Sequence, residues 1–159
     1  MTNPLRVGVA GLGTVGGGVL RLLRDNAEIV AAHAGRPIVV TTVSARDRAR
    51  DRGLKLEGVH WHDDPVALAT DTAVDVVVEL IGGSEDPARA LVFAALEAGR
   101  PMVTANKALL ARHGVALAIA AEASGASLGF EAAVAAAFRS SRHCGRDWPP
   151  TVFAALPAF

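Results

Sequence analysis

Short apolar runs alternate with longer amphipathic segments along most of the chain. Several of the runs are largely apolar on successive residues, which is typical of strands buried on both faces of a parallel sheet. These runs lie at 5–10, 38–43, 74–81 and 101–104. Weaker strand patterns occur at 59–62 and 127–131. The spacing of the runs leaves room for a helix between most neighbouring strands.

The segments between the runs carry apolar residues at helical spacing. We expect helices over 14–33, 87–98 and 107–124, and a short helix that begins at Asp64–Pro65. Residues 84–86 offer caps before the second helix, Asn106 can cap the third, and Gly125 can end it. Strands that alternate with helices predict an α/β fold, namely a Rossmann-type, doubly wound, mostly parallel sheet with helices on both faces.

Composition narrows the class of protein. The 159 residues are 51% hydrophobic and 20% charged, and 16 basic residues balance 16 acidic ones. A disordered chain is more charged, and a nucleic-acid binder carries a basic excess, so we expect neither. The uncharged apolar runs fall short of the roughly 20 residues that cross a membrane, so no membrane association is expected. A single cysteine fits a protein of the reducing cytoplasm.

Residues 11–16 read Gly-Leu-Gly-Thr-Val-Gly and match the G-x-G-x-x-G pattern between a strand and a helix. Gly11 permits the tight turn, Gly13 lets the backbone approach a pyrophosphate, and Gly16 allows close packing of helix on strand. The helix that begins at Thr14 and Val15 offers free N–H groups to the phosphates. The alternative is a glycine turn that binds no ligand. Because the pattern lies between a predicted strand and a predicted helix, we favour dinucleotide binding.

The end of the second strand indicates which dinucleotide is preferred. An NAD-binding domain usually places an acid there for the ribose 2′-hydroxyl, but residues 43–46 read Val-Ser-Ala-Arg. Arginine suits a 2′-phosphate, so Arg46 favours NADP(H), with NAD(H) as an alternative. A second interpretation is that the arginines between 46 and 52 form a solvated helix face with the neighbouring aspartates. For Arg48, Arg50 and Arg52 we favour this second interpretation.

Further candidate residues follow the later strands, where ligands bind in a doubly wound sheet. These segments are 81–84, 104–107 and Glu131. A lysine beside a bound cofactor could polarise a carbonyl substrate, and Lys107 has a suitable position. The alternative is that Lys107 is simply an exposed lysine in the first turn of a helix, and the chemistry alone favours this alternative. A positive charge is unfavourable near a helix N-terminus, however, which argues for a further reason for the lysine.

Two histidines raise the question of a metal site. His60 and His62 would share one face of a strand. Because no third or fourth ligand is spaced to join them, we assign them packing or surface roles.

Four blocks together resemble homoserine dehydrogenases, in the same order and spacing from about residue 5 to 135. The blocks are 7–19, 78–83, 103–111 and 130–135, of which the Ala-Asn-Lys and Phe-Glu-Ala-Ala-Val sequences in the last two are the most specific. The resemblance implies an oxidoreductase that interconverts L-aspartate 4-semialdehyde and L-homoserine with NAD(P), a reaction of threonine and methionine biosynthesis. It also implies a small-molecule substrate and a homo-oligomer.

The resemblance also implies roles for individual residues. The pyrophosphate would be held by Gly11, Gly13, Thr14, Val15 and Gly16. Arg46 would bind the adenosine ribose phosphate, and Gly82, Gly83 and Ser84 would lie near the ribose and nicotinamide. Lys107 is similar to the family lysine that touches cofactor and substrate. Glu131 and Val134 resemble two ligands of a structural sodium ion.

The family pattern stops after Ala135. It would continue Gly-Gly-Ile-Pro-Ile-(Ile/Val)-Lys, whereas residues 136–142 read Ala-Ala-Phe-Arg-Ser-Ser-Arg. Codons that encode 135–148 can be chosen so that one added G after codon 135 yields Ala-Gly-Gly-Ile-Pro-Ile-Val-Lys-Ala-Leu-Arg-Glu-Gly-Leu. We therefore hypothesise that one nucleotide is missing near codon 136.

We therefore expect an NAD(P)-binding domain over 1–135 and an aberrant, poorly ordered tail over 136–159. In the family, the proton-donating lysine, substrate-binding acids and dimerisation region belong to a second domain, which we expect to be missing. The sodium site would be incomplete, and the truncated chain would bind NADP(H) weakly at most and would not turn over homoserine. Two alternatives remain: another Rossmann semialdehyde reductase, and a non-catalytic NAD(P)-binding fragment or pseudoenzyme.

Overall fold

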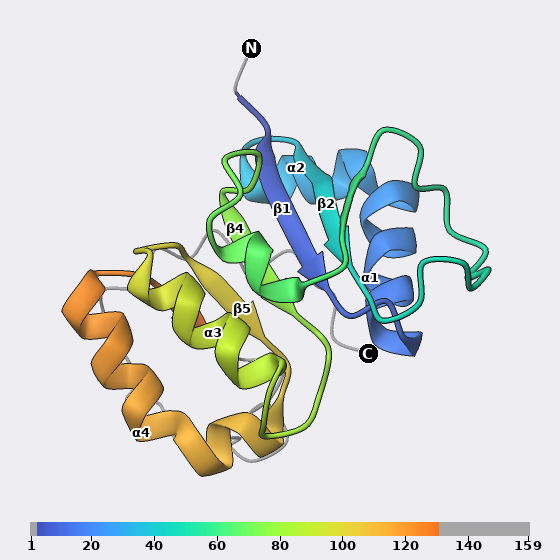
Figure 1. The fold of residues 1–159 in the computed structure, drawn as a ribbon. Helices are drawn as coiled ribbons and strands as arrows, with labels where there is room; N and C mark the ends of the chain where they lie inside the picture. The colour runs from blue at the N-terminus through green and yellow to red at the C-terminus, as the bar shows by residue number, and fades with distance from the viewer. Residues whose placement is uncertain (1–2, 131–159) are drawn as a thin grey trace.

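The computed structural model describes residues 3–130, which form a six-stranded sheet (Figure 1). The strands are β1 Leu5–Ala10, β2 Ile38–Ser44, β3 His60–His62, β4 Val76–Glu79, β5 Met102–Thr104 and β6 Leu128–Gly129. Their order is β3-β2-β1-β4-β5-β6, and every neighbouring pair is parallel. This is the strand order of a Rossmann sheet, so the predicted fold class is confirmed.

The strand order reverses at β1. On one side β1 pairs with β2, with Val9 opposite Val43, and on the other side it pairs with β4, with Val9 opposite Val78. The chain therefore leaves β1 toward one edge of the sheet and returns to build the other half from β4. Loops at such a reversal diverge and leave a crevice beyond the carboxyl ends of the strands.

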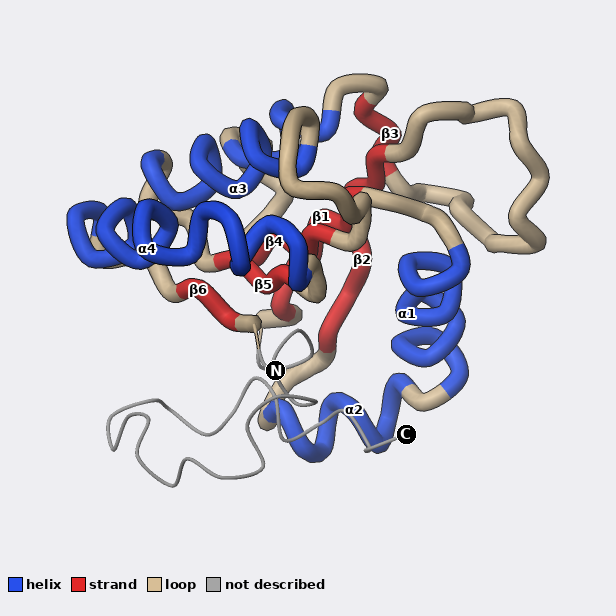
Figure 2. Tube along the Cα trace, turned by 90° about the horizontal axis from the view of Figure 1, so that it is seen from below, coloured by secondary structure: helices blue, strands red, loops and turns tan. Residues whose placement is uncertain are grey.

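Helices cover both faces of the sheet, as Figure 2 shows for α3 and α4 on one face and α1 and α2 on the other. The helices are α1 Thr14–Asp25, α2 Ala27–Ala34, the short 3₁₀ helix η1 Pro65–Ala69, α3 Ala88–Glu97 and α4 Lys107–Ser124. No helix in the described part of the chain is long and apolar enough to cross a membrane.

Each face has its own hydrophobic core. The larger core packs η1, α3 and α4 against the sheet and includes Leu68, Leu91, Leu109 and Leu117, all with no exposed surface. The smaller core packs Leu12 and segment 54–61 against β1 and β2, around the fully buried Val9 and Val43. Because side chains alternate along a strand, neighbouring residues reach different cores, and in β4 Val77 belongs to the larger core whereas Val78 packs against the smaller one.

The single helix predicted over 14–33 is wrong, because the helix breaks at Asn26. The backbone of Asn26 leaves helical geometry, and both its N–H and its side-chain Nδ2 donate to the carbonyl oxygen of Leu22, at 3.0 and 3.2 Å. Asparagine competes for backbone groups in this way, and here it ends α1 and allows α2 to start in a new direction.

Other predicted bounds also change. Strand β4 is shorter than the apolar run 74–81, and β6 is shorter than 127–131. The predicted caps at residues 84–86 are wrong, because α3 starts after Pro87 and has no side-chain cap. The cap at Asn106 is confirmed, since its side chain accepts from Leu109 N, and Gly125 ends α4 in the left-handed conformation. The predicted tail over 136–159 lies outside the described residues.

Close packing of α1 on the preceding loop depends on Gly16. A Cβ atom added there would lie 1.8 Å from the carbonyl oxygen of Gly11, which no side chain can tolerate. Gly18 lies on the same helix, but a Cβ atom there would meet nothing within 4 Å. Packing therefore requires glycine at position 16, whereas position 18 has room for a side chain.

We predict opposite effects for alanine at these two positions. Gly16→Ala forces α1 away from the loop and lowers the free energy of unfolding by about 1–3 kcal/mol or more. Gly18→Ala is the matched control and raises it by about 0.5–1 kcal/mol, because alanine favours a helix interior. Urea unfolding followed by circular dichroism measures both, and equal stability of the two variants would contradict the packing.

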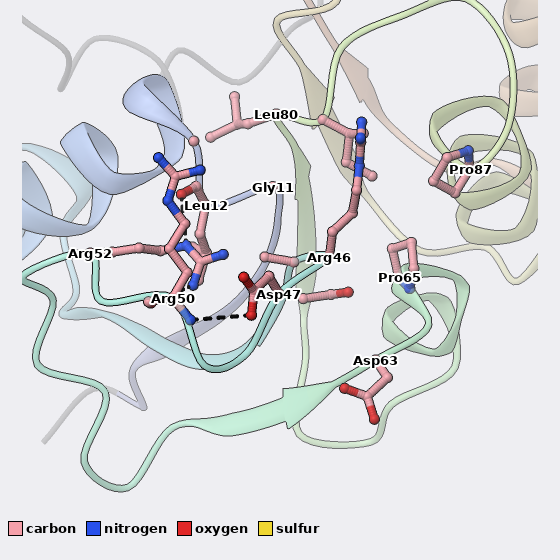
Figure 3. A pocket seen from close by; sticks show the side chains of 14 residues that line it. Gly11, Leu12, Arg46, Asp47, Arg50, Arg52, Asp63, Pro65, Leu80 and Pro87 are labelled. Atoms are coloured by element: carbon pink, nitrogen blue, oxygen red, sulfur yellow. Dashed lines mark hydrogen bonds between the residues drawn. The ribbon is translucent and has the colours of Figure 1, made fainter.

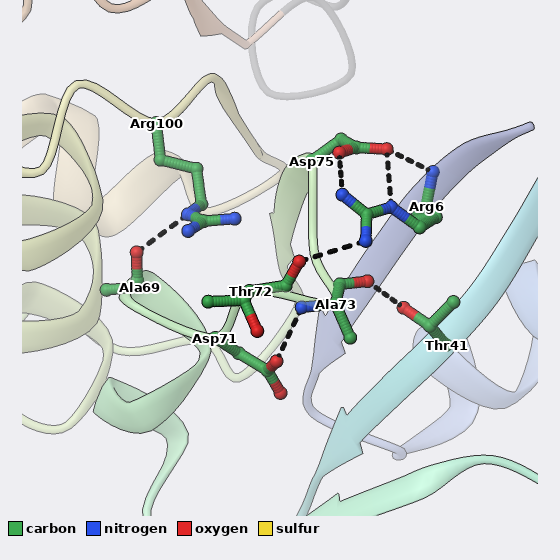
Figure 4. Close-up of polar contacts among 8 residues, drawn as sticks. All are labelled: Arg6, Thr41, Ala69, Asp71, Thr72, Ala73, Asp75 and Arg100. Carbon is green, nitrogen blue, oxygen red and sulfur yellow. Dashed lines mark hydrogen bonds and ion pairs between the residues drawn. The ribbon is translucent and has the colours of Figure 1, made fainter. Parts of the chain in front are cut away.

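An ion pair joins β1 to the start of β4 at the end of the sheet away from the crevice (Figure 4). The backbone N and the Nε of Arg6 donate to Oδ2 of Asp75 at 2.9 and 3.1 Å, and Arg6 Nη2 bonds Oδ1. The hydrogen bonds from the Arg6 side chain lower the pKa of Asp75 below its ordinary value of 3.8, against the opposing effect of burial. The ionised form of Asp75 is therefore favoured in the folded state.

Acid should weaken the ion pair between Arg6 and Asp75. Because the pKa of Asp75 is lower in the folded chain, its stabilisation is present above pH 3.8 and is lost as the pH falls through the folded value. We expect the urea midpoint of the wild-type chain to fall more between about pH 5 and pH 2 than that of Asp75→Asn. Asp25→Asn, in an exposed pair with Arg24, is the control and should follow the wild type more closely. Parallel pH curves for the wild type and Asp75→Asn would refute the assignment.

Candidate functional site

A cavity of about 480 Å³ opens at the reversal of strand order, beyond the carboxyl ends of β1, β2 and β4 (Figure 3). Its lining comes from the glycine-rich loop after β1, the loop after β2 and the end of β4, with Asp63, Pro65 and Pro87 completing the wall. These are the loops at which the sequence predicts cofactor binding. The fold therefore brings the predicted glycine loop and the predicted ribose end together.

The glycine-rich loop combines a closely packed turn with an open stretch of backbone. Gly11 has a φ of +97°, and a Cβ atom there would lie 2.5 Å from the carbonyl oxygen of Leu80, so this turn is closely packed on β4. Gly13, in contrast, is exposed, and a Cβ atom would meet nothing within 4 Å. Thr14 and Val15 begin α1 and are exposed. An open backbone surface at a helix N-terminus fits a pyrophosphate.

Arg46 lies in the loop after β2 and lines the cavity together with Arg50 and Arg52 (Figure 3). The helix face considered for residues 46–52 is wrong, because this segment contains no helix. Instead, Oδ1 of Asp47 accepts the backbone N–H groups of Ala49 at 2.9 Å and Arg50 at 3.2 Å and turns the chain. The turn places several guanidinium groups around one cavity rather than along a helix.

The surface role favoured for Arg52 is also wrong. Its Nε donates to the carbonyl oxygen of Leu12 at 3.2 Å, and its own carbonyl oxygen accepts from Arg21 Nη2 at 2.9 Å. Its guanidinium carbon lies 5.7 Å from the centre of the Trp61 ring, a cation–π distance. Arg52 therefore ties the loop after β2 to the glycine-rich loop, which lies 40 residues earlier in the chain.

The end of β4 is organised by a buried carboxylate. Glu79 has no exposed surface, and its Oε1 accepts the backbone N–H groups of Ile81 at 2.7 Å and Gly82 at 3.0 Å. Gly82 and Gly83 are exposed and both have a φ of +82°, a conformation that favours glycine. The carboxylate therefore holds the start of a loop whose backbone would otherwise be free to move.

The end of β5 is joined to the same carboxylate. Thr104 Oγ1 donates to Glu79 Oε2 at 2.6 Å and accepts from the backbone N of Asn106 at 3.0 Å. Asn106 caps α4 and its Nδ2 donates to the carbonyl oxygen of Gly83 at 2.6 Å. Lys107 is the exposed first residue of α4 and so follows directly on this cap.

Ser84 is held from α4 as well, because His113 Nε2 donates to its carbonyl oxygen at 3.0 Å. Gly82, Gly83, Ser84 and Lys107 thus lie around linked strand ends, next to the loops that line the cavity. Neither Glu79 nor Thr104 has an individual role in the sequence prediction, although Thr104 lies in the candidate segment 104–107. The available signal was an acid at the end of an otherwise apolar strand, since a buried carboxylate requires hydrogen-bond partners.

Two pairs of residues were considered as metal ligands, and only one pair was predicted to bind a metal. Glu131 and Val134, the expected sodium ligands, lie outside the described residues. His62 Nε2 lies 2.8 Å from Oδ2 of Asp71, and the rings of His60 and His62 pack edge to face. Within residues 3–130 there is no group of three or more side chains that could hold a metal ion.

Comparisons with known proteins agree with this geometry. The sequence model described as the NAD binding domain of homoserine dehydrogenase matches residues 11–131. The chain is 45% identical over 135 residues to a homoserine dehydrogenase of Mycobacterium tuberculosis, a match that covers 85% of this chain and 30% of that protein. A relative from Methylobacillus glycogenes is 47% identical over 109 residues, 69% of this chain and 26% of its own.

Solved structures give the same result. A homoserine dehydrogenase from Thiobacillus denitrificans matches with a TM-score of 0.75 and 44% identity, over 82% of this chain and 30% of that one. One from S. aureus matches with a TM-score of 0.75 and 33% identity, over 84% of this chain and 33% of that one. The chain thus spans about a third or less of the length of these relatives. It belongs to the homoserine dehydrogenase family, and residues 11–131 correspond to the NAD-binding domain of that family.

Proposed function

We propose that the chain binds NADP(H) in preference to NAD(H), with the pyrophosphate on the glycine-rich loop and the adenosine 2′-phosphate on Arg46. The open backbone at Gly13 carries this proposal, because a side chain is absent where a phosphate would approach α1. Arg46 supports the preference for NADP(H), since it lines the same cavity directly after β2 and no acid precedes it there. The next residue, Asp47, also lines the cavity, but its Oδ1 accepts the backbone N–H groups of Ala49 and Arg50.

The proposed reaction is the NAD(P)-linked interconversion of L-aspartate 4-semialdehyde and L-homoserine, for which this chain provides the cofactor-binding part. The nicotinamide cofactor supplies hydride transfer when bound. Lys107 is exposed at the end of β5 and would act on the substrate carbonyl as a cationic hydrogen-bond donor. Family membership and the cap that sets the start of α4 support this role.

We further propose that the 159 residues alone do not turn over homoserine. A single lysine does not supply both an acid–base group and substrate ligands, and the chain spans only 26–30% of the curated relatives compared above. Incubation of the chain with homoserine and NADP⁺ should therefore produce no NADPH absorbance. A full-length relative such as the M. tuberculosis enzyme is the positive control, and homoserine-dependent NADPH formation by the chain would refute the proposal.

A change of reading frame after Ala135 accounts for the missing match beyond this residue. With suitably chosen codons, one restored nucleotide turns residues 136–142 into the continuation that the family pattern predicts. Glu131 and Val134 precede this change and are proposed as ligands of a sodium ion. The nucleotide sequence at and after codon 136 is the direct check, and a locus without a substrate-domain frame downstream would contradict it.

Replacement of Arg46 tests the proposed cofactor preference. Arg46→Gln should raise the Kd for NADP⁺ about tenfold or more, which is the value of one charge-assisted hydrogen bond, and leave the Kd for NAD⁺ within about twofold. Arg48→Gln is the matched control, because Arg48 is exposed and is not among the residues that line the cavity. Fluorescence titration or calorimetry gives the four dissociation constants. If both substitutions raised the Kd for NADP⁺ equally, the cause would be the loss of one positive charge from the protein and not a contact of Arg46, and the proposal would be refuted.

A further inference from the structure

The carboxylate of Glu79 is buried without a cationic partner among residues 3–130. Its hydrogen bonds come from two backbone N–H groups and one hydroxyl, those of Ile81, Gly82 and Thr104. Removing a carboxylate from water is costly, so an acid in this position needs all of these donors. An apolar residue would fill the same space at less cost, but it would fasten neither the loop after β4 nor the end of β5.

Thr104 links Glu79 to Asn106 by hydrogen bonds. Its hydroxyl donates to the carboxylate and accepts from the N–H group of Asn106, so it acts as donor and acceptor at once. Asn106 in turn donates to the carbonyl oxygen of Gly83. These bonds form a closed ring from β4 through β5 and back to the loop after β4. The two loops therefore cannot shift independently of each other.

The ring lies where the second half of a dinucleotide must run. If the glycine-rich loop holds the pyrophosphate and Arg46 the adenosine ribose, the nicotinamide half extends the other way along the strand ends. In strand order, β1 is followed by β4 and then β5. The exposed backbone of Gly82 and Gly83 and the first turn of α4 lie at these two ends.

We propose that Glu79 and Thr104 are positioning residues that hold the loop at 81–84 and the start of α4 in register for the nicotinamide half of the cofactor. This inference rests on the proposed function, because it assumes that the cavity binds a nicotinamide dinucleotide. Neither side chain touches the cofactor, since both are fully buried. They act through the backbone of Gly82 and Gly83 and through the residue before Lys107.

The hydroxyl of Thr104 can be tested with three substitutions. Thr104→Val keeps the shape and removes the hydroxyl, Thr104→Ser keeps the hydroxyl, and Thr41→Val is a matched control. Thr41 Oγ1 donates to the carbonyl oxygen of Ala73 at 2.7 Å, so this control also loses one partly buried hydrogen bond (Figure 4). Neither Thr41 nor Ala73 is among the residues that line the cavity. Each variant is titrated with NADP⁺ and with adenosine 2′,5′-bisphosphate, which lacks the nicotinamide half, under conditions where circular dichroism shows it folded.

Thr104→Val should raise the Kd for NADP⁺ about tenfold and leave that for adenosine 2′,5′-bisphosphate within about twofold, because only the nicotinamide half loses its ordered backbone. Thr104→Ser and Thr41→Val should leave both constants within about twofold of the wild type. An unchanged Kd for NADP⁺ in Thr104→Val would overturn the inference. An equal loss for both ligands would overturn it too, since that result indicates general damage.

Amide hydrogen exchange separates failure of this inference from failure of the proposed function. A wild-type chain that binds neither ligand refutes dinucleotide binding, whereas the ring itself is tested by exchange at the N–H groups of Ile81, Gly82 and Asn106. These amides should be protected in the wild type and in Thr104→Ser, and should exchange at least about tenfold faster in Thr104→Val. Unchanged protection in Thr104→Val would mean that the hydroxyl does not hold the loops.

Discussion

The contact between the glycine-rich loop and its two neighbours decides where a ligand can bind in this domain. Gly11 packs against the carbonyl oxygen of Leu80 at the end of β4, and Gly16 packs α1 against the carbonyl oxygen of Gly11. Only hydrogen atoms fit at both places, so the helix N-terminus lies directly over the carboxyl end of β1. Because β2 and β4 then leave β1 on opposite sides, the space in front of that N-terminus stays open and becomes the cavity.

Acidic side chains have different roles at the two ends of the sheet. At the amino end of β4, Asp75 is partly exposed and paired with Arg6, so its ionised form stabilises the fold. At the carboxyl end, Glu79 is fully buried and bonded to backbone N–H groups and a hydroxyl. The first acid fastens two strands, whereas the second orders two loops. Asp75 directly precedes β4 and Glu79 ends it, so the two acids act at opposite ends of one short strand.

The fold, and the position of the glycine-rich loop between a strand and a helix, follow from local signals in the sequence. The glycine pattern, the apolar runs and the Asn106 cap depend on residues a few positions apart, and the structure agrees with each of them. The break at Asn26 and the loop at 46–52 were not predicted. Alternating arginine and aspartate resembles a solvated helix face, yet Asp47 bonds two backbone N–H groups and ends the regularity. The bond from Arg52 to Leu12 spans 40 residues, and no local pattern contains it.

Glu79 shows why the rest of the site needs the sheet register. In the sequence it is an acid at the end of an apolar strand, and its partner Thr104 comes 25 residues later. Only the parallel pairing of β4 with β5, which sets Glu79 opposite Thr104, brings the carboxylate and the hydroxyl together. Both residues point toward the face covered by α3 and α4, where an unpaired polar group would be costly. Each of the two buried polar side chains therefore has the other as its hydrogen-bond partner, and this pairing can be recognised only when the strand order is known.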